Sequence, residues 1–407
     1  MQHERTNAAG LSSSCGVSDP ADRLLDDPEL LRRFGITRVG DVTDLDVIGV
    51  PVWFAVRPNS RGLSVAQGKG LSVRQAKLSA VMEAIEGAVG EETGRHVREQ
   101  GTPDALLARG LCPVPLERMA RVNPDHFDAN RERAWVKGYS ARDNRPVFAP
   151  YELVGMDFRA DFPWDRKAFQ MTSQGMAAGF DEDRVVLHAL LELVEHDACV
   201  LIDTFETRAL GLRTITIAPG RLPELDALLA RLAALNLPVR FFDLTGAIGV
   251  PVILAGIERP LMSDAGPGHR HAAGIACRLD PLEAALSALL EAIQSRLTDI
   301  SGARDDLSPD RYRPDFSTRS DNAAVLGGVP QALDLAARGG ATDGHGPVWR
   351  QLAQHLFQVG VQDIYVFPLE TGVPGIFVTR VLADGLSTGN SGLNQLSLNT
   401  LSGFLKS

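Results

Sequence analysis

One short pattern occurs three times in this 407-residue chain, and it constrains the fold and the chemistry more than any other feature. The three segments read LSAVMEAIEG, HALLELVEHD and LSALLEAIQS. In each, an acid is followed three positions later by an acid or an amide, and the pairs are Glu83 and Glu86, Glu192 and Glu195, and Glu291 and Gln294. Residues three apart lie on one face of a helix. Each segment therefore predicts a helix that offers two oxygen ligands at one place.

The residues around these acids predict a metal site. The first pair is flanked almost entirely by apolar residues, and the second helix is similar. Helices that are apolar nearly all round are usually buried, and buried carboxylates are usually paired or bound to a metal. Five converging carboxylates repel one another, and Mg²⁺ is commonly held by one or two carboxylates with phosphates completing its shell. We therefore expect a Mg-ATP site. The alternative is that these are surface acids paired with Lys77, Arg74 or Arg184.

Three cations are candidate phosphate ligands. Lys69 stands between two glycines in QGKGLS, where the backbone can approach a ligand closely and the ammonium can meet a phosphate. Arg296 follows Gln294 by two residues, and Arg304 lies in SGARDD. A guanidinium binds phosphate through two hydrogen bonds, which makes both arginines candidate clamps. The alternative for each is a surface ion pair.

The remaining patterns predict a mixed α/β, or α+β, layered fold. Long apolar-periodic runs, each with a Ser or Asp near its start as a plausible cap, predict helices over 72–92, 181–205, 222–236 and 280–300. Strand-like runs recur between them as hairpin-like pairs, which favours antiparallel and mixed sheets over a strict βαβ series. No GxGxxG after a strand and no GxxxxGK[ST] is present. We expect residues 1–19 to be disordered and 20–407 to form one catalytic domain.

Composition excludes several classes of protein. The formal net charge is −10 and no basic cluster is present, which argues against nucleic-acid binding. The four cysteines lie far apart, with no CxxC pair and no zinc-type spacing, so neither a zinc site nor a disulfide framework is predicted. The start lacks the apolar region of a signal peptide, and no run is long enough to span a membrane. We expect a cytoplasmic protein.

Three segments together resemble the YcaO-like family. The run 64–87 is similar to its Gly-Lys-Gly loop followed by Ser-x-x-x-Glu-x-x-Glu, and 174–198 and 282–306 resemble its second and third ATP-site segments, within a match from about Ile48 to Leu382. The resemblance implies a YcaO-like layered fold in which three helices, packed on mixed and antiparallel sheets, hold ATP and Mg²⁺. It implies metal binding by Glu83, Glu86, Glu192 and Glu195, and nucleotide binding by Ser79, Glu291 and Gln294, with Lys69, Arg296 and Arg304 as further candidates.

The resemblance also implies a reaction. Family members phosphorylate a peptide amide oxygen, which a nucleophile then displaces; a side chain gives an azoline and sulfide gives a thioamide. No catalytic protein nucleophile is assigned. Gly87 and His196 stand where an Arg is common in the family, and the tail lacks a Pro-x-Pro-x-Pro ending. That tail and the run 33–70 look more like members that work with a TfuA-like partner, which implies a thioamide and a sulfur donor.

Other functions stay open at this point. The runner-up is an azoline-forming cyclodehydratase that acts on Cys, Ser or Thr of a precursor peptide. A reading from another class is a non-catalytic nucleotide-binding accessory protein, in which Gly87 and His196 mark decay of the site. A metal-dependent hydrolase could use the same carboxylates on water. The family resemblance also implies a homodimer.

Overall fold

Two of the three β-sheets in the described residues are wholly antiparallel along their main path. The computed structural model describes residues 19–119, 127–161, 165, 168–169, 171–204, 213–258, 271–308, 331–333 and 346–387. One sheet has the order β1 (Arg38–Asp41), β2 (Val52–Val56), β3 (Val65–Lys69). The largest has the order β4 (Val97–Gly101), β5 (Arg133–Ser140), β13 (Asp363–Leu369), β14 (Phe377–Asp384), β7 (Met176–Gly179), with β6 (Pro146–Pro150) paired to β5.

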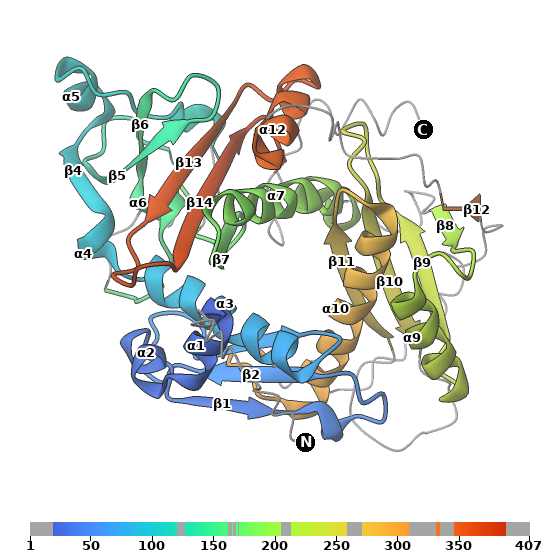
Figure 1. The fold of residues 1–407 in the computed structure, drawn as a ribbon. Helices are drawn as coiled ribbons and strands as arrows, with labels where there is room; N and C mark the ends of the chain where they lie inside the picture. Colours follow the sequence, from blue (N-terminus) through green and yellow to red (C-terminus); the bar gives the residue numbers. More distant parts are fainter. Residues whose placement is uncertain are drawn as a thin grey trace, which may run out of the picture.

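The third sheet is mixed. Its order is β11 (His271–Cys277), β10 (Val252–Glu258), β9 (Val239–Asp243), β8 (Arg213–Thr216), β12 (Gln331–Ala332), and only the β8–β12 pair is parallel. Together the sheets and helices form the mixed α/β layered fold that the sequence predicts (Figure 1). In the described part of the chain, no helix is long and apolar enough to cross a membrane.

The predicted long helices are confirmed as α3 (Val73–Gly90), α7 (Glu182–Thr204), α9 (Pro223–Ala234) and α10 (Pro281–Ser301). Ser72, Asp181 and Asp280 accept backbone N–H bonds at the starts of α3, α7 and α10. The cap of α9 differs from the prediction, because Leu222 has no side-chain acceptor. The shorter helices are α1 (Pro20–Asp26), α2 (Pro28–Arg33), α4 (Thr93–His96), α5 (Pro103–Ala108), α6 (Tyr151–Val154) and α12 (Val348–Gln358), with 3₁₀ turns η1 (Thr43–Leu45) and η2 (Leu116–Arg118).

The N-terminal prediction falls largely outside the described residues. Of the segment 1–19, the structure describes Asp19, whose carboxylate accepts the N–H of Ala21 and caps α1. The assignment of 20–407 to one domain stays a prediction.

One supersecondary unit occurs three times in the described residues. Each unit has a central strand with two antiparallel neighbours, one of which leads directly into a long helix. The units are β1-β2-β3 with α3, β9-β10-β11 with α10, and β13-β14-β7 with α7. A Gly-Val-Pro sequence precedes each central strand, and its glycine has a positive φ at Gly49, Gly249 and Gly372. In the third unit, β7 and α7 come before β13 and β14 in the chain.

The helices close the core by covering the sheets. The apolar faces of α9 and α10 pack on the β8–β11 strands, and α7 and α12 cover one face of the largest sheet around Val366 and Val381. The other face of that sheet packs with α3 around Trp135 and Phe367. As predicted, α3 is largely surrounded by protein, because from Ala76 to Gly90 every residue except Glu83 is buried or half-buried. In Figure 1 the helices α3, α7 and α10 surround the middle of the molecule, with β7 between α3 and α7 and β11 between α7 and α10.

Gly274 allows strand β11 to approach helix α10 closely, and it supplies a test of the fold. A Cβ on Gly274 would lie 2.3 Å from the backbone N of Ala292 and 2.4 Å from the carbonyl O of Ala288, both on α10. Backbone atoms inside a packed helix cannot move away easily, so Gly274→Ala is expected to lower the free energy of unfolding by about 1–3 kcal/mol or more. Urea denaturation measures it.

The matched control is Gly256→Ala on the adjacent strand β10, where nothing lies within 4 Å of the added Cβ. Equal denaturation midpoints for the two variants would contradict the close packing of β11 on α10.

Candidate active site

The structure brings together the five carboxylates of the repeated pattern. Glu83 on α3 lies within the electrostatic range of Glu192 on α7 and Glu291 on α10. The charges of Glu192 and Glu83 act on Glu86, and those of Glu291 and Glu192 act on Glu195. The three helices therefore direct these faces to a shared region, which we call the carboxylate cluster. Its members are Glu83, Glu86, Glu192, Glu195 and Glu291.

A cycle of hydrogen bonds fixes the second residue of each pair. Glu86 Oε1 accepts the N–H of Ala178 on β7 at 2.8 Å, and Glu195 Oε2 accepts the N–H of Cys277 on β11 at 3.0 Å. Gln294 Nε2 donates to the carbonyl O of Gln67 on β3 at 3.4 Å. Each helix thus reaches the strand that precedes the helix of another unit, and the three bonds close a ring.

The ring explains the amide at Gln294. Two of its bonds end on backbone N–H groups, for which a carboxylate is a good acceptor. The third ends on a carbonyl oxygen, which needs a donor. A carboxylate at position 294 would face that oxygen without a proton to share.

Burial and mutual repulsion both act on the cluster. Desolvation, followed by neighbouring carboxylates, raises the pKa of Glu86 well above its usual value. Desolvation raises the pKa of Glu83 to about 7 against the pull of Lys69 and Arg304, and desolvation with the charge of Glu291 raises that of Glu195 to about 7. Glu83 is nevertheless exposed, and Glu86 and Glu195 are half-buried. The cluster is therefore surrounded by protein atoms and still open to a ligand.

Two of the predicted cations lie at this cluster. Lys69 Nζ is 3.0 Å from Glu291 Oε2, which joins the end of β3 to α10. Arg304 follows α10, and its charge acts on Glu83. Its Nε and Nη2 donate to the two oxygens of Asp306 at 3.0 and 2.6 Å, which holds the guanidinium in place.

Ser79 lies one turn before Glu83 on α3 and is half-buried. In the described part of the chain, its hydroxyl makes no hydrogen bond to another side chain or to the backbone. It remains available to a ligand.

Arg296 does not join the cluster, which corrects the prediction of a phosphate clamp there. Its Nε and Nη2 donate to both carboxylate oxygens of Asp46 at 2.7 and 3.0 Å. That pair is largely buried, with 17% and 2% of the side chains exposed. Positions 294 and 296 lie on nearly opposite faces of a helix, because successive residues advance by about 100°. The arginine therefore holds η1 against α10.

The two family departures have local explanations. A Cβ on Gly87 would lie 2.7 Å from Arg57 Nη1, so the guanidinium of Arg57 occupies the space beside it. That guanidinium forms a buried pair with Glu91 at 2.7 Å. His196 lies 3.7 Å from Glu192, and although burial favours the neutral ring, the carboxylates around it raise its pKa overall.

Sequence reasoning missed Arg380 on β14. It is 3% exposed, and its Nε and Nη2 donate to the carbonyl oxygens of Leu153 and Thr172 at 3.1 and 2.7 Å. Its Nη1 is buried without a hydrogen-bond partner, and burial lowers its pKa to about 10 against the opposing charge of Glu192. The third Gly-Val-Pro, at residues 372–374, comes shortly before β14, and this repeat was the signal that could have placed the strand at the site.

The donor set fits Mg²⁺ that is bound together with phosphate. Among the residues that the structure describes, no three His, Cys, Asp or Glu side chains already surround one point. Mg²⁺ usually takes one or two carboxylates and leaves the rest of its shell to water and phosphate oxygens. Its charge would also relieve the repulsion that raises the carboxylate pKa values.

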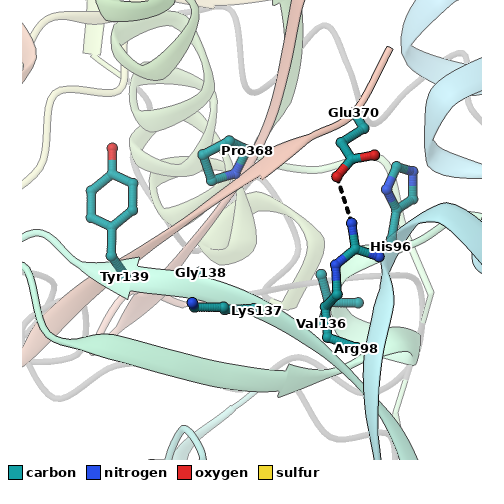
Figure 2. Close-up of a pocket in the computed structure, with 8 residues that line it drawn as sticks. All are labelled: His96, Arg98, Val136, Lys137, Gly138, Tyr139, Pro368 and Glu370. Carbon is teal, nitrogen blue, oxygen red and sulfur yellow. Dashed lines mark hydrogen bonds and ion pairs between the residues drawn. The ribbon is translucent and has the colours of Figure 1, made fainter. Parts of the chain in front are cut away.

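A separate pocket of about 280 Å³ lies on the largest sheet (Figure 2). Its lining includes the Arg98–Glu370 ion pair and the side chains of Lys137 and Tyr139, and it contains no residue of the carboxylate cluster. It is not the candidate site.

Comparison with known proteins shows the family and the fold. The family model for YcaO cyclodehydratase, ATP- and Mg²⁺-binding, matches residues 67–387. The chain belongs to the YcaO family. This YcaO chain is 34% identical over 414 residues to an uncharacterized protein in the tfuA 3′ region of Rhizobium leguminosarum bv. trifolii, and the match covers 96% of both. It is 29% identical to a protein of Methanothermobacter thermautotrophicus, over 90% of this chain and 94% of that one.

Solved structures show the same fold. The YcaO of Methanopyrus kandleri, bound with AMPPCP and Mg²⁺, is 22% identical, covers 90% of both chains and superposes with a TM-score of 0.67. A heterocyclase in complex with substrate and cofactor is 20% identical with a TM-score of 0.72 and covers 91% of this chain. The chain spans about half of that heterocyclase, 53% of its length. ATP and Mg²⁺ are accordingly the cofactors of the family to which the chain belongs.

The raised pKa of Glu83 gives a test without any ligand. A carboxyl with a pKa of about 7 in the folded protein, against 4.5 as its ordinary value, binds its proton more tightly when folded. Its ionisation therefore reduces stability. Wild type should lose stability relative to Glu83→Gln as the pH rises from about 4.5 to about 7, and the difference should then level off. Thermal denaturation without Mg²⁺ across this range measures it.

A stability difference that does not change with pH, or that grows toward acid, would show that Glu83 is not desolvated in this way.

Proposed function

We propose that this protein uses ATP and Mg²⁺ to activate a backbone amide oxygen in a ribosomally made peptide or protein, and that the product is a thioamide. A TfuA-like partner and a sulfur donor would take part. The family and the carboxylate cluster support the activation step. The relative in the tfuA 3′ region, which is similar over nearly the whole of both chains, supports the TfuA-like partner.

The observation that carries the proposal is the convergence of five carboxylates from three helices, with Lys69 at the end of β3 and Arg304 just after α10. We assign Glu83, Glu86, Glu192 and Glu195 to the magnesium ions. Lys69, Ser79, Glu291, Gln294 and Arg304 are assigned to the nucleotide. The ion pair with Glu291 holds the Lys69 ammonium beside the cluster. A phosphate bound there would replace one of the contacts of this ammonium. Arg296 is left out of the nucleotide site because its guanidinium is held in a largely buried pair with Asp46, whereas the Arg304–Asp306 pair is more exposed and Arg304 acts on Glu83.

The chemistry follows from the leaving group. An amide oxygen leaves poorly, whereas phosphate leaves well. The amide oxygen attacks the γ-phosphorus of ATP, the bond to the bridging oxygen breaks and ADP departs. Hydrosulfide then adds to the former carbonyl carbon, and the C–O bond breaks to release phosphate. Cations at the transferring group neutralise its charge in such reactions, which is what the carboxylate-held metal would supply.

The second candidate is azoline formation, in which a Cys, Ser or Thr side chain replaces hydrosulfide. It is favoured by the similarity to heterocyclase structures and needs the same activation step. A non-catalytic accessory protein and a metal-dependent hydrolase are the competing classes. Glu83→Ala and Glu192→Ala should abolish ATP turnover if the site is catalytic. The homodimer stays a prediction.

The proposed nucleotide contacts can be separated from the structural arginine. Lys69→Met and Arg304→Gln each remove a charge-assisted hydrogen bond worth about 1.5–3 kcal/mol, so ATP affinity should fall about 10- to 100-fold. Arg296→Gln is the matched control and should change ATP affinity by less than about twofold while lowering stability. Calorimetric titration with a non-hydrolysable ATP analogue measures both.

If Arg296→Gln weakens nucleotide binding as much as Lys69→Met does, the arginine contacts phosphate and its assignment to Asp46 alone is wrong.

The product is tested by mass spectrometry of a peptide encoded beside the gene, incubated with the protein, Mg-ATP, hydrosulfide and a TfuA-like protein. Replacement of one oxygen by sulfur is the expected mass change. A mass decrease equal to one water molecule would show that an azoline forms, and it would overturn the proposal that the product is a thioamide. ATP consumption with no change in the peptide would favour the hydrolase.

A further inference from the structure

His188 lies on the same helix face as two members of the carboxylate cluster. It precedes Glu192 by four residues and Glu195 by seven on α7, and this spacing keeps the three side chains on one face. The imidazole is exposed, whereas Glu192 and Glu195 are half-buried. A substrate that enters the cluster can therefore reach this ring.

Charged groups from all three repeated units surround His188. Glu192 acts on it from its own helix, Lys69 from the end of β3, and Arg278 from the residue that follows β11. His196 on the same helix is close to Glu192, but His188 makes no hydrogen bond or ion pair within the described residues. The ring thus faces the place where the units meet and keeps both nitrogens available.

The surroundings of His188 favour its neutral form, mainly through desolvation. Burial by surrounding protein atoms, Arg278 and Lys69 lower the pKa of the imidazole, and Glu192 opposes them without reversing the shift. A neutral imidazole at neutral pH can accept a proton. The carboxylates nearby are assigned to metal, and the Lys69 ammonium is a donor only, so neither serves as a base.

The proposed reaction needs a proton acceptor. When an amide oxygen is phosphorylated, its nitrogen must lose its proton for a neutral C=N bond to form. We propose that the His188 imidazole takes this proton during phosphoryl transfer and returns it to the nitrogen when hydrosulfide has added and phosphate leaves. The hydrosulfide proton departs with the phosphate, so the ring ends neutral. This inference rests on the proposed function.

The test is His188→Ala in the full chain, assayed for peptide conversion with Mg-ATP and hydrosulfide. Loss of a general base should slow conversion about 10²- to 10⁴-fold while the affinity for an ATP analogue stays within about twofold. Added imidazole should restore part of the rate, and the restoration should follow the unprotonated fraction of the added imidazole as the pH rises. Glu182→Ala, an exposed position on another face of α7, is the matched control.

The outcomes separate the two proposals. If His188→Ala converts the peptide at the wild-type rate, His188 has no role in proton transfer. The proposed function is unaffected by that result. Slow conversion without imidazole rescue, or with an equal loss of nucleotide affinity, also overturns it, because the ring would then be structural. A wild-type protein that consumes ATP without altering any peptide contradicts the proposed function, and the inference falls with it.

Discussion

The hydrogen-bonded ring that joins α3, α7 and α10 is the constraint on which the candidate site depends. Glu86 and Glu195 each accept one backbone N–H from a strand of another unit, and Gln294 donates to a third strand. A carboxylate held in this way has one oxygen fixed to the protein and the other free. The ring therefore joins the three units, and in the proposed site it would also orient the carboxylates toward their ligands.

The charged carboxylates of the cluster reduce the stability of the unliganded protein. Carboxylates that are desolvated and close together hold protons at a higher pH than usual, which means that their charged forms are disfavoured in the unliganded protein. A divalent cation bound at the cluster, as proposed, would remove that penalty, so the unliganded fold would already favour its binding. The buried guanidinium of Arg380, with one donor unused, adds a fixed positive charge behind the same helices.

The sequence predicted what helical periodicity can reveal. The acid pairs, the helix starts at Ser72, Asp181 and Asp280, and the mixed fold follow from local spacing and caps. Arg296 was expected at the phosphates because it follows Gln294 closely in the sequence, whereas in the structure Asp46, 250 positions away, holds it. The partners of Gln294 and Arg380 lie on distant strands, so only the tertiary structure could reveal them. The repeated Gly-Val-Pro was readable, but it marks strands rather than chemistry.

The permuted order of the third unit has a consequence for how the protein is made. Its strand β7 and helix α7 are synthesised in the middle of the chain, but their sheet neighbours β13 and β14 are synthesised near the end. A ribosome-bound chain that has already emerged through α10 carries all five carboxylates while α7 still lacks the sheet face on which it packs. Contacts this distant in sequence form late. The packing of α7 on its sheet therefore has to wait until the chain has been synthesised through β14.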